Sequence, residues 1–305
     1  MKKIFVLGSI NMDLVISVAS IPEIGESKNG HGFMQNQGGK GANQAVACKK
    51  LGSSDVRLIA CVGKDENGQA LISSMEKYEI DTTAIKVKDD VASGVCMIIL
   101  DEEKQDNMLI IDRGANDAIE IEDFKDYLRE NASSGDIFIT QLEVNLDAVY
   151  EGLKIAKEIG MYTILNPAPV TAFDKECLKN VDLIIPNETE AKLLTGINTE
   201  DESNLSKVYE YFNSLGIKEV IVTLGSRGSS YIKDNNIIFC PSFKVKAVDT
   251  TSAGDTFIGA LAMRISNGYS IEESLSFASK CSSITVSRKG AAVSIPTRDE
   301  IKEFL

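Results

Sequence analysis

Short apolar runs alternate along the chain with segments whose apolar residues recur at helical spacing. Most of the apolar runs stop at Gly, Pro, Asn or Glu, as buried strands do. The runs occupy 2–8, 56–63, 135–143, 162–169, 181–188 and 218–225, and the helical patterns occupy 42–52, 69–78, 148–160, 188–196 and 205–216. A regular alternation of strand and helix predicts an α/β fold in which helices flank a mostly parallel central sheet.

Two segments interrupt this alternation. Residues 14–37 and 91–114 contain strand-like runs with no helical pattern between them. We expect them to pair into a small antiparallel β-sheet that projects from the core as a lid. Residues 1–13, 38–90 and 115–305 would then form the α/β core. A small sheet that is apolar on more than one face needs a bound ligand, another subunit or both to cover it.

The composition narrows the possible partners. The 305 residues carry a formal charge of −13 and no block of Lys and Arg, so neither nucleic acid nor a membrane surface is an expected partner. Asn11 and Asp13 interrupt the first apolar run, which therefore predicts a strand rather than a secretory signal. The six cysteines lie far apart without a C-x-x-C pair, which is typical of buried thiols in a reducing cytoplasm. The single histidine, His31, argues against hydrolysis by a catalytic triad.

Polar residues gather near the first strand and the first helix. Asn11 and Asp13 follow the strand, and Gly39, Lys40 and Asn43 lie in the glycine-rich stretch where the helix begins. In an open parallel sheet, ligands bind beyond the carboxyl ends of the strands, so these side chains are candidates for binding. Both groups also have a purely structural explanation, because an Asn-x-Asp sequence often forms a turn and glycines often reverse the chain.

Two later strands end in the same way. Glu143 closes the third apolar run, and the apolar residues 181–186 of a later run lead into Asn187 and Glu190. Asn187 and Glu190 have the spacing of a helix capping box, and Glu143 could stabilise the N-terminus of the next helix through its charge. Capping is therefore an alternative to ligand binding at both places.

The stretch DTTSAGDTF, residues 249–257, carries the clearest chemistry. A helical apolar pattern begins directly after it, so the small residues Ser252, Ala253 and Gly254 let backbone N–H groups converge on an anion. Asp255 lies in the same turn, where we expect the helix dipole to lower the pKa of its carboxyl. An anion cradle beside a carboxylate is what phosphoryl transfer to a hydroxyl requires. The chain contains neither a Walker A motif nor the dinucleotide-binding glycine fingerprint after its first strand.

At these residues the sequence resembles the ribokinase-like carbohydrate kinases, essentially from end to end. The motifs that carry the resemblance occur in the family's order and spacing. They are GSINMD, GGKGANQAVA, QLE, NPAP, PNETEAKLLTG, TLGSRG, VDTTSAGDTFIGAL and SRKGAAVSIP.

The resemblance implies a role for each candidate. Asp255 would be the base that activates the sugar's 5-hydroxyl, with Ser252, Ala253 and Gly254 as the anion hole. The residues that would hold the sugar are Asn11, Asp13, Gly39, Lys40, Asn43 and Glu143, with Lys40 contributing largely through its backbone. Asn187 and Glu190 would help to organise Mg²⁺ and phosphate through water. The nucleotide loop would comprise Thr223, Gly225, Ser226 and Gly228, with Ser279 near the adenine.

The resemblance also implies a site for an activating potassium ion, held mostly by backbone carbonyls beside the anion hole. Its residues would be Asp249, Thr251, Thr285, Arg288, Gly290 and Ser294. In the family, the projecting strands form a lid over the sugar, and two lids clasp to make a homodimer. Ser252 stands where the family more often has Ala or Gly, and Ser279 falls near a position that often carries His or Asn. The target of Arg113 stays open.

The sequence therefore predicts a cytoplasmic sugar kinase that uses ATP, Mg²⁺ and K⁺ to phosphorylate the 5-hydroxyl of D-ribose. Deoxyribose, another pentose or hexose, or a nucleoside would keep the chemistry and change the acceptor. A non-catalytic sugar or nucleotide sensor on the same fold is a further alternative, although it would have no need of Asp255.

Overall fold

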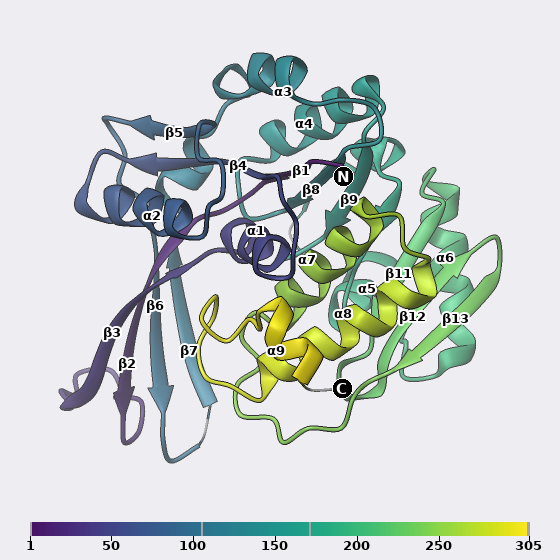
Figure 1. Ribbon diagram of the computed structural model, residues 1–305. Coiled ribbons are helices and arrows are strands. Elements are labelled where there is room, and N and C mark those ends of the chain that lie inside the picture. The colour runs from purple at the N-terminus through teal and green to yellow at the C-terminus, as the bar shows by residue number, and fades with distance from the viewer. Residues whose placement is uncertain (1, 105, 171, 304–305) are drawn as a thin grey trace.

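The computed structural model describes residues 2–104, 106–170 and 172–303. Over these residues the chain forms a central sheet with helices on both faces and a smaller sheet that projects from it (Figure 1). The predicted α/β fold with a separate small sheet is confirmed. No helix within the described residues is both long enough and apolar enough to cross a membrane.

The central sheet has nine strands among the described residues. In pairing order they are β13 (Asn236–Pro241), β12 (Gly228–Lys233), β11 (Glu219–Thr223), β10 (Leu183–Ile184), β9 (Tyr162–Asn166), β8 (Ile137–Gln141), β1 (Ile4–Leu7), β4 (Val56–Gly63) and β5 (Ile85–Lys88). Neighbours from β11 to β5 pair in parallel, and β12 and β13 add an antiparallel edge. The inner strands β1 and β8 are buried along their whole length, which explains their continuous apolar sequence.

Helices form a layer on each face of this sheet (Figure 1). One core cluster joins the sheet to α1 (Lys40–Lys50), α2 (Glu66–Lys77), α7 (Ala253–Ser266), α8 (Ile271–Val286) and α9 (Arg298–Glu303). The other joins its opposite face to α3 (Lys125–Asn131), α4 (Leu146–Ile159), α5 (Glu188–Thr195) and α6 (Leu205–Ser214). Since β1 contributes Ile4 and Val6 to one cluster and Phe5 and Leu7 to the other, alternate side chains anchor the two layers.

The small sheet pairs in the order β3 (Gly30–Gly38), β2 (Asn11–Val18), β6 (Gly94–Asp101) and β7 (Asp106–Asp112). Its outer pairs are antiparallel, as expected, whereas β2 and β6 run parallel in its centre. Both strands leave the core at the same edge, with Asn11 opposite Gly94, and therefore point the same way. Apolar side chains are exposed on this sheet at Phe33, Met34, Met97, Met108, Leu109, Ile110 and Ile111.

Candidate active site

A cavity of about 210 Å³ lies at the carboxyl ends of β9, β10 and β11, beside the start of α7. It is the place at which an open parallel sheet binds ligands. Its walls are formed by Lys40, Asn166, Ala168, Ile185, Asn187, Glu190, Thr223, Thr250, Ser252, Ala253, Gly254, Asp255 and Ile258. Eight of the residues singled out from the sequence are therefore brought to one cavity: Lys40, Asn187, Glu190, Thr223, Ser252, Ala253, Gly254 and Asp255.

The first turn of α7 leaves room for a ligand. Ser252 is the N-cap residue in a left-handed conformation, with φ of 59°, and its side chain does not cap the helix. This conformation suits glycine better than serine. A Cβ built at Gly254 would meet no heavy atom within 4 Å. Neither packing nor a positive φ requires glycine at this position, so the space above it is free for an approaching anion.

Asp255 is buried in the same turn and is held by side chains from α1. Gln44 Nε2 donates to Asp255 Oδ1 at 3.0 Å, and Asn43 Nδ2 donates to Oδ2 at 3.3 Å. Burial raises the pKa of Asp255 above its ordinary value, although Lys40 and the two amides act in the opposite direction. The expectation of a lowered pKa is therefore wrong, because removal of the carboxylate from water outweighs the groups that lower its pKa.

The glycine-rich loop before α1 packs against the end of β1. Gly39 has φ of 91°, and a Cβ on it would lie 2.7 Å from the carbonyl oxygen of Ser9. The backbone N–H of Lys40 donates to Glu143 Oε2 at 3.2 Å, and Ser9 Oγ donates to the same oxygen. The ammonium group of Lys40 interacts with nearby carboxylates. Burial alone would lower its pKa, but Asp255, Glu143 and Glu190 raise it overall.

Asn11 and Asp13 lie in the first part of β2, where it leaves the core, and are not on the wall of the cavity. Burial, with the charges of Glu143 and Asp255, raises the pKa of Asp13 to about 7. A buried carboxyl of this kind gains most when polar hydrogens are brought to it, as the hydroxyls of a polyol would do.

Asn187 and Glu190 begin α5 and form the capping box that their spacing predicts. The Asn187 side chain accepts from the Glu190 N–H, and Glu190 Oε2 accepts from the Asn187 N–H, each at 2.8 Å. Both residues also line the cavity, and burial raises the pKa of Glu190. Capping and a role in the cavity are therefore compatible at one helix start.

The expected nucleotide loop connects β11 to β12. Thr223 lines the cavity at the end of β11, whereas the other members lie outside its wall. Gly225 and Gly228 have φ of 56° and 120°, which permits the tight reversal around Ser226. Gly228 pairs with Pro241 in β13, and Ser279 Oγ donates to the Pro241 carbonyl at 3.3 Å. Ser279 of α8 is thereby placed against the same part of the sheet.

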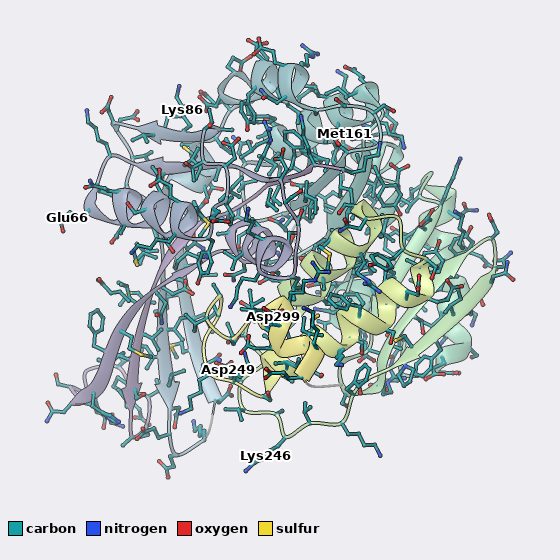
Figure 2. The ribbon with its side chains drawn as sticks, viewed as in Figure 1. Glu66, Lys86, Met161, Lys246, Asp249 and Asp299 are labelled. Carbon is teal, nitrogen blue, oxygen red and sulfur yellow. The ribbon has the colours of Figure 1, made fainter. Side chains whose placement is uncertain are left out.

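Three of the six residues expected to hold a monovalent cation, Asp249, Thr251 and Gly290, are joined by hydrogen bonds. The other three have partners of their own. Asp249 accepts from the N–H of Thr251 and from that of Gly290, both at 2.9 Å. In Figure 2, Asp249 lies beside the C-terminal segment. Burial would raise the pKa of Asp249, but these hydrogen bonds lower it overall. The flanking contacts are Thr285 with Thr256, Arg288 with Glu300 and Ser294 with the Ala291 carbonyl.

Several polar residues were missed in the sequence. Thr250 lines the cavity, and Gln44, Gln141 and Asn166 form an amide network next to Asp255. Gln141 and Asn166 end β8 and β9, so the polar strand ends that identified Glu143 could also have found them. Gln44 could only have been found from its position beside Asn43 in α1.

The target of Arg113 is internal. Its Nη2 donates to the carbonyl of Leu142 at 2.7 Å, and its Nη1 to Asp117 at 3.1 Å. The carbonyl of Arg113 in turn accepts from Asn116 Nδ2 at 2.9 Å, which also donates to Asn11 Oδ1 at 2.7 Å. Arg113 therefore ties the end of β7 to the segment that carries Glu143, and this network orients Asn11.

Comparison with known proteins agrees with this geometry. The model of the pfkB family carbohydrate kinases matches residues 1–298. The ribokinase of Haemophilus influenzae is 38% identical over 304 residues, which cover 100% of this chain and 98% of the relative. A deoxyribokinase of Salmonella typhi is 33% identical over 303 residues, covering 99% and 98%. The solved structure of Arabidopsis thaliana ribokinase complexed with ribose and ATP has a TM-score of 0.89 at 30% identity, covering 99% of this chain and 98% of that one. The chain belongs to the pfkB family of carbohydrate kinases.

Proposed function

We propose that this carbohydrate kinase transfers the γ-phosphoryl group of ATP to the 5-hydroxyl of D-ribose and releases D-ribose 5-phosphate and ADP. The observation that carries the proposal is the start of α7, where the buried Asp255 adjoins the open space above Gly254. A hydroxyl placed beside Asp255 can give up its proton to the carboxylate while its oxygen attacks phosphorus. Charge that develops on the phosphoryl oxygens would be met by the N–H groups of Ser252 and Gly254, since the N–H of Ala253, also expected in the anion hole, donates to the carbonyl of Thr250 at 3.2 Å.

Ribose is the proposed acceptor because the acidic side of the site suits a compact polyol. Asn11, Asp13 and Glu143 lie close together with Asn43 and the Gly39–Lys40 loop. Carboxylates and amides that are buried together reject analogues that lack the matching hydroxyls. The similarity to a deoxyribokinase makes deoxyribose the second candidate acceptor.

The phosphate side of the cavity would hold ATP between the α7 turn and the nucleotide loop. Thr223, Gly225, Ser226 and Gly228 would contact the nucleotide, with Ser279 near the adenine. Asn187 and Glu190 would assist Mg²⁺ through water. Glu190 fits this role because it presents a carboxylate, an oxygen ligand of the kind Mg²⁺ prefers, on the cavity wall. The bound metal would supply charge neutralisation on the phosphates.

The monovalent-cation site would link two loops beside the anion cradle. Asp249 already joins the turn at Thr251 to the segment at Gly290, which places a carboxylate between backbone loops. Thr285, Arg288 and Ser294 lie in the same segment. K⁺ held there would order the start of α7 and offset nearby negative charge.

The small sheet is proposed to act as lid and dimer clasp, with residues 14–37 and 91–114 as its extent and 1–13, 38–90 and 115–305 as the core. Its exposed apolar side chains support this role. Ile110→Lys should convert the expected homodimer into a monomer, measured by analytical ultracentrifugation. A cytoplasmic location is proposed because the cysteines are buried free thiols.

The activity is tested by ADP release from the purified protein with ATP, Mg²⁺ and K⁺. D-Ribose, deoxyribose, other sugars and nucleosides are compared separately. The expected result is the highest kcat/KM for D-ribose, and a higher value for another acceptor would correct the substrate. Asp255→Asn should bind ribose but lose about 100-fold or more in kcat, because a general base is removed. An unchanged kcat would rule out Asp255 as the base.

A further inference from the structure

A chain of buried amides leads from the backbone of Ile185, directly after β10, to Asp255. Gln44 and Gln141 are each 0% exposed, and Asn166 is 8% exposed. Gln44 Nε2 donates to Asn166 Oδ1 at 3.3 Å and to Asp255 Oδ1 at 3.0 Å, while Gln44 Oε1 accepts from Gln141 Nε2 at 2.7 Å. Since three separate elements supply these amides, their assembly is a property of the fold and not of one motif.

The direction of the hydrogen bonds in this chain is fixed at its Asn166 end. Asn166 Nδ2 donates to the backbone carbonyl of Ile185 at 3.2 Å, and a carbonyl can only accept. The oxygen of Asn166 must therefore face Gln44 and receive one of its two N–H groups. The second N–H of Gln44 is then directed at the carboxylate of Asp255, and Gln44 Oε1 accepts from Gln141.

This arrangement treats the two oxygens of Asp255 differently. Oδ1 has the shorter hydrogen bond, to Gln44, whose own orientation is fixed by Asn166. Oδ2 has the longer contact, 3.3 Å, with Asn43, a residue that also donates to Ser252 Oγ at 2.9 Å. A general base must present one oxygen to the hydroxyl in a defined direction, since misplacement by about 1 Å can cost 100-fold in rate.

We propose that Gln44 is a positioning residue for phosphoryl transfer: it holds Oδ1 of Asp255, so that Oδ2 is the oxygen presented to the acceptor hydroxyl. Asn166 keeps the amide of Gln44 in the orientation that donates, because its own amide is anchored on the backbone carbonyl of Ile185. The proposal rests on the proposed function, in which Asp255 is the base. The same hydrogen bond lowers the pKa of Asp255 against the effect of burial, which helps to keep the carboxylate ionised.

The test compares Gln44→Met with Gln141→Met. Both substitutions keep the approximate volume and remove the buried hydrogen bond between Gln44 and Gln141, but only the first removes the donor to Asp255. For Gln44→Met we expect kcat to fall by about tenfold or more, with KM for the sugar and for ATP within about threefold of wild type. For Gln141→Met we expect kcat to stay within about threefold of wild type, because Asn166 and Asp255 still accept from Gln44.

Thermal melting of both variants separates positioning from loss of structure. Equal losses of kcat in the two variants, or a change in KM alone for Gln44→Met, would overturn the proposal. If Gln44→Met does not fold, Gln44→Leu provides the same comparison, because leucine also lacks the donor to Asp255. A folded Gln44→Leu with wild-type kcat would also overturn it.

Failure of the proposed function gives a different result. Wild-type turnover of another acceptor would correct the substrate, and the two variants would then be compared on that acceptor. An unchanged kcat in Asp255→Asn would remove the base itself, whatever the result for Gln44.

Discussion

The substitution Gly254→Ala should have opposite effects on the stability of the protein and on its catalytic activity. Gly254 lies in the first turn of the helix, has no positive φ, and its added methyl group would meet no heavy atom within 4 Å. Alanine is favoured over glycine in a helix by about 0.5–1 kcal/mol, because it loses less backbone entropy on folding. The variant should therefore be as stable as the wild type or more so, with a Tm higher by up to about 4 °C.

The same methyl group would occupy the space above the anion cradle. Loss of one preorganised donor to a developing anion costs about 100-fold or more, and a methyl group that keeps the phosphoryl oxygens at a distance should weaken several donors together. We therefore expect kcat/KM to fall by at least about 100-fold while Tm rises. ADP release at saturating and subsaturating ATP measures the first effect, and differential scanning calorimetry measures the second.

Gly152→Ala is the matched comparison, because it makes the same substitution within α4. There the methyl group would lie 2.9 Å from Leu7 Cδ2 and 3.1 Å from Phe138 Cζ, so overpacking should cost about 1–3 kcal/mol. The folded protein should keep the wild-type kcat. Gly152→Ala is therefore expected to lower stability and leave activity unchanged, whereas Gly254→Ala is expected to lower activity and leave stability unchanged or higher. Wild-type turnover by Gly254→Ala would refute the assignment of the anion to this turn.

Three further outcomes are expected. Asp13 has a pKa of about 7 in the folded protein against an ordinary value of 3.8. The contribution of Asp13 to the free energy of unfolding is therefore fully present below about pH 4. Up to about 4 kcal/mol of it is lost as the pH rises through 7. Asp13→Asn should raise Tm most at pH 8 and progressively less towards pH 4; a uniform change would contradict this reasoning. Replacing K⁺ by tetramethylammonium should lower kcat, and an unchanged rate at all concentrations would exclude the cation site. Burial raises the pKa of Cys48 and Cys177 to about 12, so iodoacetamide should modify them only after unfolding, as measured by mass spectrometry.

The sequence predicted those features that are local in the chain. Continuous apolar runs identified the inner strands, because a strand buried on both faces has no polar positions. The turn at Asp255 was recognisable because its small residues are consecutive. The parallel pairing of β2 and β6 was not, since alternation of side chains specifies a strand but not its direction.

The amide network was hidden for a different reason. Gln141 and Asn166 lie 97 and 122 residues from Gln44 along the chain, and only the packing of α1 against the sheet brings them together. The direction of the pKa shift of Asp255 was predicted wrongly for the same reason, because it too depends on contacts between distant parts of the chain. A helix dipole can be anticipated from sequence, whereas the loss of solvent depends on every element that surrounds the carboxyl.

The distribution of charge explains how an acidic protein can use an anionic co-substrate. Asp13, Glu143, Glu190 and Asp255 interact with one another or with Lys40, so carboxylates outnumber the cation at this place. Salt screens such buried charges poorly, and a triphosphate would be repelled unless its own charge were offset where it binds. The N–H groups at the start of α7 and a metal ion carried with the phosphates can do so locally. Sugar hydroxyls are neutral donors that suit the remaining carboxylates, so the acidic side of the site favours the sugar and the α7 turn favours the phosphate.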